Sequence, residues 1–251
     1  MTAPGNVATE KHSPELRGLF VVGTDTGVGK TFVATAIVRA LRAQGVHVGA
    51  YKPVVSGCET GGDESPVWSD IALLDEATGH QFPDDRIGPQ RFRAPLAPPV
   101  AARLEGRAVD RKLLRAGFDW WRGQVDSIIV EGAGGLLSPI AEGETVADLA
   151  GDLGLPVLIV SRLGLGAINQ TLLTVEAAQR RKLKLAGILI NDCDDCADSL
   201  AGETNPGLLA EYCSVPILAV WPHCRPEALL QMPDFRTMNW VALMQPCRQS
   251  L

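Results

Sequence analysis

A glycine-rich stretch, GTDTGVGKT from Gly23 to Thr31, constrains the fold of this chain more than any other feature. It follows an apolar run at 19–22 and opens onto a helix-like run at 31–43, which gives the order strand, tight turn, helix. This context is typical of a P-loop, in which backbone N–H groups and the helix N-terminus hold phosphate oxygens. In such a loop Lys30 reaches the β- and γ-phosphates, and the Thr31 hydroxyl takes Mg²⁺.

The spacing of this loop departs from the usual pattern. Five residues, where a P-loop normally has four, separate Gly23 from the Gly-Lys pair, so Thr24 stands at the usual first-glycine position. The alternative is an ordinary glycine turn between a strand and a helix. The flanking strand and helix favour a variant P-loop, because the motif requires both.

Composition bounds the class of protein. The 251 residues, 46% of them hydrophobic, suffice for one large α/β domain. A formal net charge of −6 predicts no general nucleic-acid or anionic membrane surface, and no apolar run is long enough to span a bilayer. Residues 1–17 are polar and lack an apolar signal core, so we expect a disordered tail there, one P-loop ATP-binding domain over 18–251, and a cytoplasmic location.

Apolar strand-like runs alternate with helix-like runs along the chain. This alternation predicts an α/β fold with a mostly parallel sheet of about seven strands and helices on both faces, as in P-loop NTPases. The expected strands include 18–22, 46–51, 127–130, 155–161, 185–190 and 217–220. The expected helices are 31–44, 69–78, 99–105, 110–123, 146–153, 164–181, 205–213, 226–232 and 235–244, and 92–99 is expected to be a proline-rich loop.

Two charged residues stand at the ends of expected strands. Glu131 follows the apolar run at 127–130 and precedes glycines, which is the Walker-B arrangement of a carboxylate that orders Mg²⁺. Lys52 follows the strand at 46–51, at the edge where open α/β sheets bind ligands. The alternatives are an acid that merely faces water and a solvated surface lysine.

Two helix starts have both a structural and a functional interpretation. Ser69 or Asp70 is suited to cap the helix at 69–78. The stretch GLGAIN at 164–169 either holds an anion on its free N–H groups or is a plain glycine turn.

The cysteines do not predict a metal or redox site. Six cysteines in a chain of this length do not form a dense disulfide framework, so free thiols are expected. Cys193 and Cys196 form a C-x-x-C pair, but no second pair stands at zinc-finger spacing, and neighbouring acids disfavour a reactive thiol. None of the four histidines lies in an HxxxH or HxH pair, so a histidine-based metal site is not expected.

Taken together, several motifs resemble those of the ATP-dependent dethiobiotin synthetase family over about residues 18–223. They are GTDTGVGKT, YKPVVSG at 51–57, SD at 69–70, VEGAGG at 130–135, LGAINQT at 165–171 and IND at 190–192. The resemblance implies a ligase that uses ATP to close a urea ring on 7,8-diaminononanoate. One amine takes up CO₂ as a carbamate, the carbamate attacks the γ-phosphate, and the other amine displaces phosphate.

The resemblance also implies roles for individual residues and a homodimer with a shared active site. Lys52, Lys30 and Thr26 match catalytic positions, and Thr31, Asp70 and Glu131 match Mg²⁺ ligands. Substrate-binding positions match Thr26, Lys52, Ser56 and, from the neighbouring subunit, Gly166, Ala167 and Asn169. Nucleotide-binding positions match Gly27, Val28, Gly29, Lys30, Thr31, Phe32, Asp70, Glu131, Gly132, Ala133, Gly134, Asn191, Asp192, Pro222, His223 and Cys224, with Asn191 as the adenine-reading residue.

The chain departs from the family pattern at three places. Some members carry an acid where this chain has Gly27. The last strand commonly ends in Gly-x-Ile-Pro, whereas here 219–222 reads AVWP, and the loop at 95–99 is poorer in Ser and His. The AVWP departure puts the adenine-side contacts in question.

Three other functions share this scaffold. A ligase of the cobyrinate diamide synthetase type carries an extra glutamine amidotransferase domain, for which nothing long enough follows Cys213. A switch ATPase of the septum-site or plasmid-partition type has a lysine where this chain has Asp25. A nucleotide-binding module without catalysis is not distinguished by the sequence.

Overall fold

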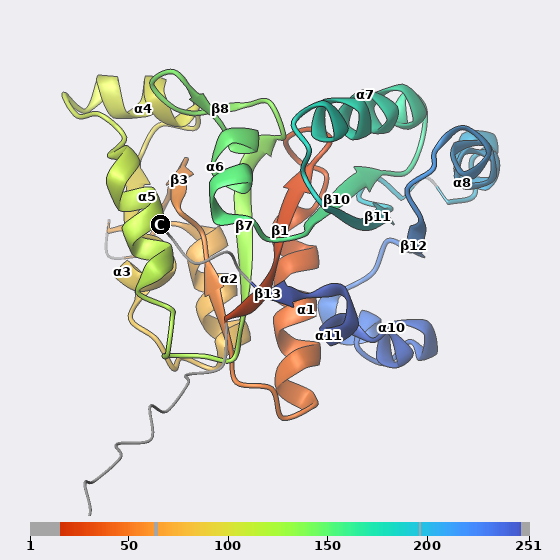
Figure 1. The fold of residues 1–251 in the computed structure, drawn as a ribbon, viewed down its shortest axis with the longest axis horizontal. Helices are drawn as coiled ribbons and strands as arrows, with labels where there is room; N and C mark the ends of the chain where they lie inside the picture. Colours follow the sequence, from red (N-terminus) through yellow and green to blue (C-terminus); the bar gives the residue numbers. More distant parts are fainter. Residues whose placement is uncertain (1–15, 63–64, 196, 247–251) are drawn as a thin grey trace, which may run out of the picture.

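The computed structural model describes residues 16–62, 65–195 and 197–246. A seven-stranded sheet organises these residues (Figure 1). Six of its strands run parallel in the order β12-β11-β10-β1-β7-β2. Their bounds are β1 Arg17–Gly23, β2 Val48–Tyr51, β7 Ser127–Gly135, β10 Val157–Arg162, β11 Leu185–Asn191 and β12 Ile217–Trp221.

The seventh strand, β13 (Gln245–Pro246), pairs antiparallel with the first residues of β1. The prediction of a mostly parallel α/β sheet of about seven strands is confirmed. Most of the expected tail, residues 1–15, lies outside the described residues, and β1 begins at Arg17, one residue before the expected start.

Helices cover both faces of the sheet. The helix after the P-loop, α1 (Lys30–Ala43), packs on β1, β2 and β7 and against α2 (Ser69–Thr78). On the other side α6 (Val146–Leu153) packs on β7, and α7 (Ala167–Arg180) packs on β10. From β1 the chain moves toward β2, and from β10 it moves in the opposite direction, so right-handed crossovers place α1 and α7 on opposite faces.

The core forms where apolar strands lie between these helices. In β1 the side chains at 19–22 are fully buried, and those at 128–130 in β7 and 157–160 in β10 are equally enclosed. Continuous apolar runs of this kind are what a parallel sheet covered on both faces requires. The polar ends of the same strands are therefore left at one edge of the sheet.

Short elements complete the structure around this edge and at the end of the chain. The strand pairs are β3 (Val54–Ser56) with β6 (Gln90–Phe92), β4 (Glu59–Thr60) with β5 (Pro66–Val67), and β8 (Pro139–Ala141) with β9 (Glu144–Thr145). The remaining helices are α3 (Asp84–Ile87), α4 (Pro98–Leu104), α5 (Arg111–Asp119), α8 (Leu200–Tyr212), α9 (Pro226–Leu229), α10 (Pro233–Thr237) and α11 (Trp240–Leu243).

Several predicted bounds were wrong for identifiable reasons. The helix expected at 205–213 begins at Leu200, because the Ser199 hydroxyl caps it by accepting a hydrogen bond from the Gly202 N–H. Pro206 therefore lies inside this helix. The helix expected at 235–244 is broken after Thr237, and Asn239 caps the second piece. The strand expected to end at Val130 continues to Gly135, and the helix expected to reach Gly123 ends at Asp119.

The loop expected over 92–99 is shorter than predicted. Phe92 ends β6, and Pro98 begins α4. Within the described ranges, no helix combines the length and the apolar character needed to cross a membrane.

Candidate active site

The P-loop follows β1 and turns into α1 with two glycines in the left-handed region. Gly27 has a φ of 76° and Gly29, the N-cap of α1, a φ of 87°, a conformation that favours glycine. A Cβ atom on Gly29 would lie 2.2 Å from Asn191 Nδ2. The Lys30 ammonium folds back along the loop and donates to the Asp25 carbonyl at 3.0 Å. This strand, loop and helix confirm the structural context that the motif requires.

Thr31 brings two distant carboxylates together. Its hydroxyl lies 2.8 Å from Asp70 Oδ1 and 2.9 Å from Glu131 Oε1. Asp70 comes from the first turn of α2, whose N-cap is Trp68, so the alternative that Ser69 or Asp70 caps this helix is wrong. Glu131 lies inside the extended β7 and is 1% exposed, which excludes an acid that merely faces water.

Lys52 contacts the same two carboxylates. Its ammonium lies 2.9 Å from Asp70 Oδ2, contacts Glu131 Oε1, and donates to the Gly132 carbonyl at 3.3 Å. The side chain is 4% exposed, which excludes a solvated surface lysine. The positive and negative groups of the site therefore balance one another in this structure.

Burial and charge shift the pKa values of these groups. Burial favours a neutral amine at Lys52, but Glu131 and Asp70 outweigh it and raise the Lys52 pKa. Burial opposes ionisation of Asp70, but Lys52 and the Thr31 hydroxyl lower its pKa. Burial, and secondarily the charge of Lys52, lower the Lys30 pKa to about 8. Lys52 and Asp70 are therefore held as an ion pair. Lys30, in contrast, loses its proton at a pH much closer to neutral than an ordinary lysine does.

The donor set around Thr31 fits a magnesium ion. Thr31, Asp70 and Glu131 offer hard oxygen ligands, which Mg²⁺ prefers when it also binds nucleotide phosphates. Glu131 Oε2 is buried without a hydrogen-bond partner among the residues that the structure describes. Such an oxygen is costly to bury unless a cation or donor satisfies it.

A pocket of about 560 Å³ opens over these groups. Its polar part is formed by the P-loop, Lys52, Ser56, Asp70 and Glu131. Its apolar part comes from Val55, the segment 95–98, Ala133 and Pro139. Of the residues expected in the site, those that line this pocket are Thr26, Gly27, Gly29, Lys30, Thr31, Lys52, Ser56, Asp70, Glu131, Ala133 and Gly134.

Known proteins resemble this chain in sequence. A family model described as an AAA domain matches residues 17–226. The ATP-dependent dethiobiotin synthetase BioD of Anaeromyxobacter dehalogenans (strain 2CP-C) is 52% identical over 176 residues, which cover 70% of this chain and 77% of that protein. The BioD of Bacillus subtilis (strain 168) is 40% identical over 207 residues, which cover 82% and 87% of the two chains.

The chain belongs to the ATP-dependent dethiobiotin synthetase family. Members of this family are ATP-dependent ligases, so the chain is an enzyme of that class.

Solved structures show the same fold at low sequence identity. A ParA family ATPase from Chlorobium tepidum matches with a TM-score of 0.52 and 14% identity over 90% of this chain and 91% of its own. The septum site-determining protein MinD from Pyrococcus horikoshii matches with a TM-score of 0.51 and 17% identity over 91% and 88%. These likenesses confirm the P-loop NTPase-like fold.

The residues expected on the adenine side of this synthetase-family site lie outside the pocket. Asn191, at the end of β11, is 4% exposed, and its Nδ2 donates to the Val28 carbonyl at 3.1 Å. Val28 is fully buried. The Asn191 amide NH₂ group therefore already bonds the P-loop backbone. The sequence analysis did not predict this contact.

The other expected nucleotide-binding positions Phe32, Asp192, Pro222, His223 and Cys224 lie near the end of β12. The Phe32 ring lies edge-on to Trp221 at 6.2 Å between centroids. The Asp192 carboxylate accepts a hydrogen bond from the Ala197 N–H, and His223 Nδ1 lies 3.2 Å from the Asp192 carbonyl oxygen. Pro222 and Cys224 adjoin His223 in the chain, and Cys224 is a half-buried free thiol.

The start of α7 lies apart from the 560 Å³ pocket. Gly166 is the N-cap with a φ of 85°, Ala167 is buried, and Asn169 is exposed. A second hollow of about 480 Å³ is lined by residues of α7, by Thr24 and Asp25 of the P-loop and by the segment 135–139. The α7 start therefore does not reach the Lys52 pocket of its own chain.

The C-x-x-C pair is only half described. Cys193 is a half-buried free thiol whose pKa is raised, first by burial and then by Asp194, so a reactive thiolate is disfavoured. Cys196 lies outside the described residues. Among the residues that are described, no group of three His, Cys, Asp or Glu side chains is arranged to hold a metal ion.

Some site residues carry no sequence signal. Ser138 and Pro139 line the pocket, and the Ser138 hydroxyl accepts the Gly135 N–H at 2.9 Å. They follow the glycines after Glu131, but no motif marks them. Residues 95–98 of the expected proline-rich loop also line the pocket.

Proposed function

We propose that the chain converts 7,8-diaminononanoate, CO₂ and ATP into dethiobiotin, ADP and phosphate, a step of biotin biosynthesis. Family membership supports this function. The observation that carries the assignment to this pocket is the position of Lys52. Its ammonium contacts the carboxylates of Asp70 and Glu131, which also bond Thr31 of the P-loop. Lys52 lines, with Lys30, a pocket that has apolar side chains on part of its surface.

The pocket has the right chemistry for a molecule that is polar at one end and aliphatic along its length. Val55 and the segment 95–98 offer apolar surface to a methylene chain. Lys52, Thr26 and Ser56 lie at the polar part, where a carbamate and an amine require charge and hydrogen bonds. We assign the diamine end of the substrate to this polar part.

The proposed reaction passes through a carbamate and a carbamic-phosphoric anhydride. One amine nitrogen bonds to CO₂ and loses a proton, which gives a carbamate. A carbamate oxygen then attacks the γ-phosphorus, the bond from γ-phosphorus to the bridging oxygen breaks, and ADP leaves. The second amine attacks the carbonyl carbon of the resulting carbamic-phosphoric anhydride and loses a proton, and phosphate departs with the former carbamate oxygen. Ring closure completes a cyclic urea.

The chain contributes position and charge to these steps. Lys30 neutralises the phosphates that the P-loop N–H groups hold. Lys52 stabilises the negative charge on the carbamate and the transferring phosphoryl group. Thr31, Asp70 and Glu131 would hold Mg²⁺, which when bound neutralises phosphate charge.

We also propose that the site is shared across a homodimer. Gly166 and Asn169 are exposed at the α7 start, and the Ala167 N–H donates to the Gly164 carbonyl at 3.3 Å. This helix start lies outside its own chain's pocket. A helix N-terminus suits a carboxylate. We assign these residues to the carboxylate end of a substrate held by the partner chain.

The path from bicarbonate oxygen to phosphate tests the mechanism. With ¹⁸O-labelled CO₂ and bicarbonate, we expect one labelled oxygen in each phosphate released during dethiobiotin formation. The reaction is quenched before the labelled bicarbonate exchanges its oxygen with water. An incubation without the diamine is the control. Dethiobiotin accompanied by unlabelled phosphate would overturn attack by the carbamate on ATP.

A further inference from the structure

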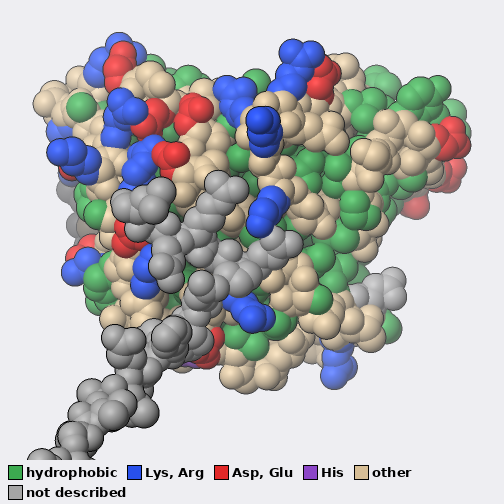
Figure 2. Space-filling view, viewed as in Figure 1, with side chains coloured by type: hydrophobic (Ala, Val, Ile, Leu, Met, Phe, Trp, Pro, Cys, Tyr) green, Lys and Arg blue, Asp and Glu red, His purple; other side chains and the backbone are tan. Residues whose placement is uncertain are grey.

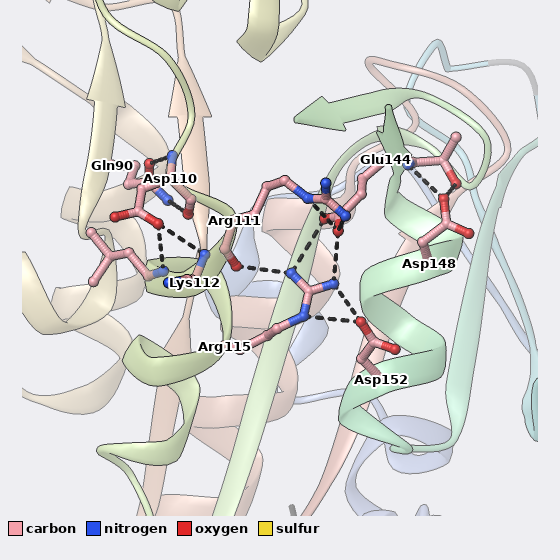
Figure 3. A network of polar contacts seen from close by, with 10 residues as sticks. Gln90, Asp110, Arg111, Lys112, Arg115, Glu144, Asp148 and Asp152 are labelled. Carbon is pink, nitrogen blue, oxygen red and sulfur yellow. Dashed lines mark hydrogen bonds and ion pairs between the residues drawn. The ribbon is translucent and has the colours of Figure 1, made fainter. Parts of the chain in front are cut away.

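The first turn of α5 is tied to β6 by a reciprocal amide pair (Figure 3). Gln90 Nε2 donates to the Asp110 carbonyl at 3.0 Å, and the Asp110 N–H donates to Gln90 Oε1 at 2.7 Å. Gln90 is 3% exposed. The Asp110 carboxylate also caps α5 by accepting the N–H groups of Lys112 and Leu113. The helix start is therefore fixed to the strand.

The same turn is tied to β9 by charge. Arg111 Nε donates to Glu144 Oε1 at 2.6 Å, and Arg115 donates to both Glu144 oxygens at 3.2 Å. Glu144 is buried, so these charge-assisted bonds are poorly screened. Arg115 also binds Asp152 of α6, which is more exposed. Figure 2 shows basic and acidic side chains close together over α4 and α5.

Each tie leads directly to one wall of the 560 Å³ pocket. From Gln90, β6 runs into the segment 95–98, which forms the first wall. Glu144 in β9 pairs with Ala141 in β8, which begins at Pro139, and the Val146 N–H donates to the Ser138 carbonyl at 3.0 Å. Ser138 and Pro139 form the second wall. The five residues Gln90, Asp110, Arg111, Arg115 and Glu144, which we name the α5 brace, therefore join the two walls.

We propose that the α5 brace sets the separation of these walls and thereby selects the substrate by its shape. Gln90 and Glu144 are then positioning residues that touch no reacting atom. This inference rests on the proposed function, because the selected molecule is 7,8-diaminononanoate. A buried Glu with two arginines is weak evidence for stability, since apolar replacements are often as stable. Glu144 instead ties α5 to the β8–β9 hairpin that carries the second wall, and this link is the basis for its role in specificity.

Glu144→Gln and Gln90→Met test the brace at its two ends. Each should raise KM for the diamine about three- to tenfold and lower discrimination against the homologue one methylene longer by a similar factor. The Kd for ADP should not change, because the P-loop is not part of the brace. Asp152→Asn is the matched control. It removes the negative charge of the exposed partner of Arg115, and should change neither KM nor selectivity.

The double variant distinguishes one brace from two separate contacts. An interruption at either end releases the walls, so Glu144→Gln with Gln90→Met should be no worse than the more affected single variant. Strictly additive effects would overturn the single brace. Unchanged KM and selectivity, with only a lower melting temperature, would reduce it to a structural role.

A structural readout separates this inference from the proposed function. Crystal structures of the wild type and Glu144→Gln should differ in the separation of Pro139 from Leu96, whatever the enzyme turns over. An unchanged separation overturns the brace. Wild-type protein that forms no dethiobiotin, combined with a changed separation, would overturn the substrate assignment and leave the mechanical role of the brace supported.

Discussion

The Lys52 ammonium lies 2.9 Å from Asp70 Oδ2 and also contacts Glu131 Oε1. The chain's own cation thus rests on the two carboxylates that we assign to Mg²⁺. A metal ion at Thr31, Asp70 and Glu131 competes with this ammonium for the same negative charge. Metal binding and the freedom of Lys52 to contact a substrate are therefore expected to be linked.

Removal of the Lys52 charge should strengthen divalent metal binding in the absence of nucleotide. Lys52→Met keeps much of the side-chain volume but leaves Asp70 and Glu131 uncompensated, so we expect Mn²⁺ affinity to rise about tenfold or more. Electron paramagnetic resonance measures free Mn²⁺ directly. Lys112→Met, an exposed position, controls for net charge. Equal affinity in wild type and Lys52→Met would refute the competition.

Lys52→Ala should lower kcat about 10²- to 10³-fold, as loss of one preorganised donor does. ATP affinity should stay nearly intact, because the P-loop holds the phosphates without Lys52. Lys52→Arg should rescue poorly, since its planar fork is larger than a point ammonium. Steady-state kinetics and ATP titration separate the two effects. An unchanged kcat, or lost ATP binding with normal turnover at saturation, is incompatible with this role.

Asn191→Ala should weaken the binding of ADP and of GDP by the same factor, about three- to tenfold. The reason is that Asn191 Nδ2 holds the Val28 carbonyl of the P-loop at 3.1 Å, which both nucleotides require. Asn205→Ala, which removes an amide that bonds Gly164 instead, is the control. Calorimetric titration measures the four affinities. Loss confined to ADP would assign Asn191 to adenine reading alone.

Nucleotide binding should take up a proton at alkaline pH. Burial, with the nearby charge of Lys52, lowers the Lys30 pKa to about 8. Phosphate beside Lys30 favours its ammonium and raises that pKa. Above pH 8 the free amine must therefore gain a proton as ADP binds, and affinity falls as pH rises. Below pH 7 Lys30 is already charged and contributes no uptake.

Calorimetry without Mg²⁺ measures this uptake from the heat of ADP binding in two buffers of different ionisation enthalpy. At pH 9 the expected uptake approaches one proton. The same titration at pH 6.5 is the internal control. The same heat in both buffers at pH 9 would contradict a lowered Lys30 pKa.

Mixing two inactive variants tests the shared site. Asn169→Ala and Lys52→Ala chains should each be nearly inactive alone. In a heterodimer one pocket combines an intact Lys52 with an intact Asn169 of the partner, so activity should rise toward a quarter of wild type at full exchange. Subunit exchange is followed by native mass spectrometry. Exchange without recovered activity would reject the cross-subunit role.

The parts of the site that sequence predicted are those carried by contiguous residues. The P-loop and the acid at Glu131 are local signals, because strand, turn and charged residue follow one another in the chain. The choice between a helix cap and a site residue at Asp70, and between a solvated lysine and a site residue at Lys52, depended on contacts between residues far apart in the sequence. Thr31 meets Glu131 across a hundred positions of sequence, a distance that no local pattern covers.

The remaining differences have equally specific causes. Pro206 resembles a helix start, yet the Ser199 cap begins α8 earlier. Asn239 breaks an apolar periodic run into α10 and α11 by capping the second piece. The contacts of Gln90 with Asp110 and of Glu144 with Arg111 join separate elements and involve common surface residue types. Sequence alone therefore gave no sign of the α5 brace.

The most direct test of the proposed function is product formation from defined substrates. Purified protein is incubated with ATP, Mg²⁺, bicarbonate and 7,8-diaminononanoate, and ADP and dethiobiotin are quantified by mass spectrometry. We expect one dethiobiotin for each ADP, and background ADP release when the diamine is omitted. ADP release that is independent of the diamine, with no dethiobiotin, would contradict it.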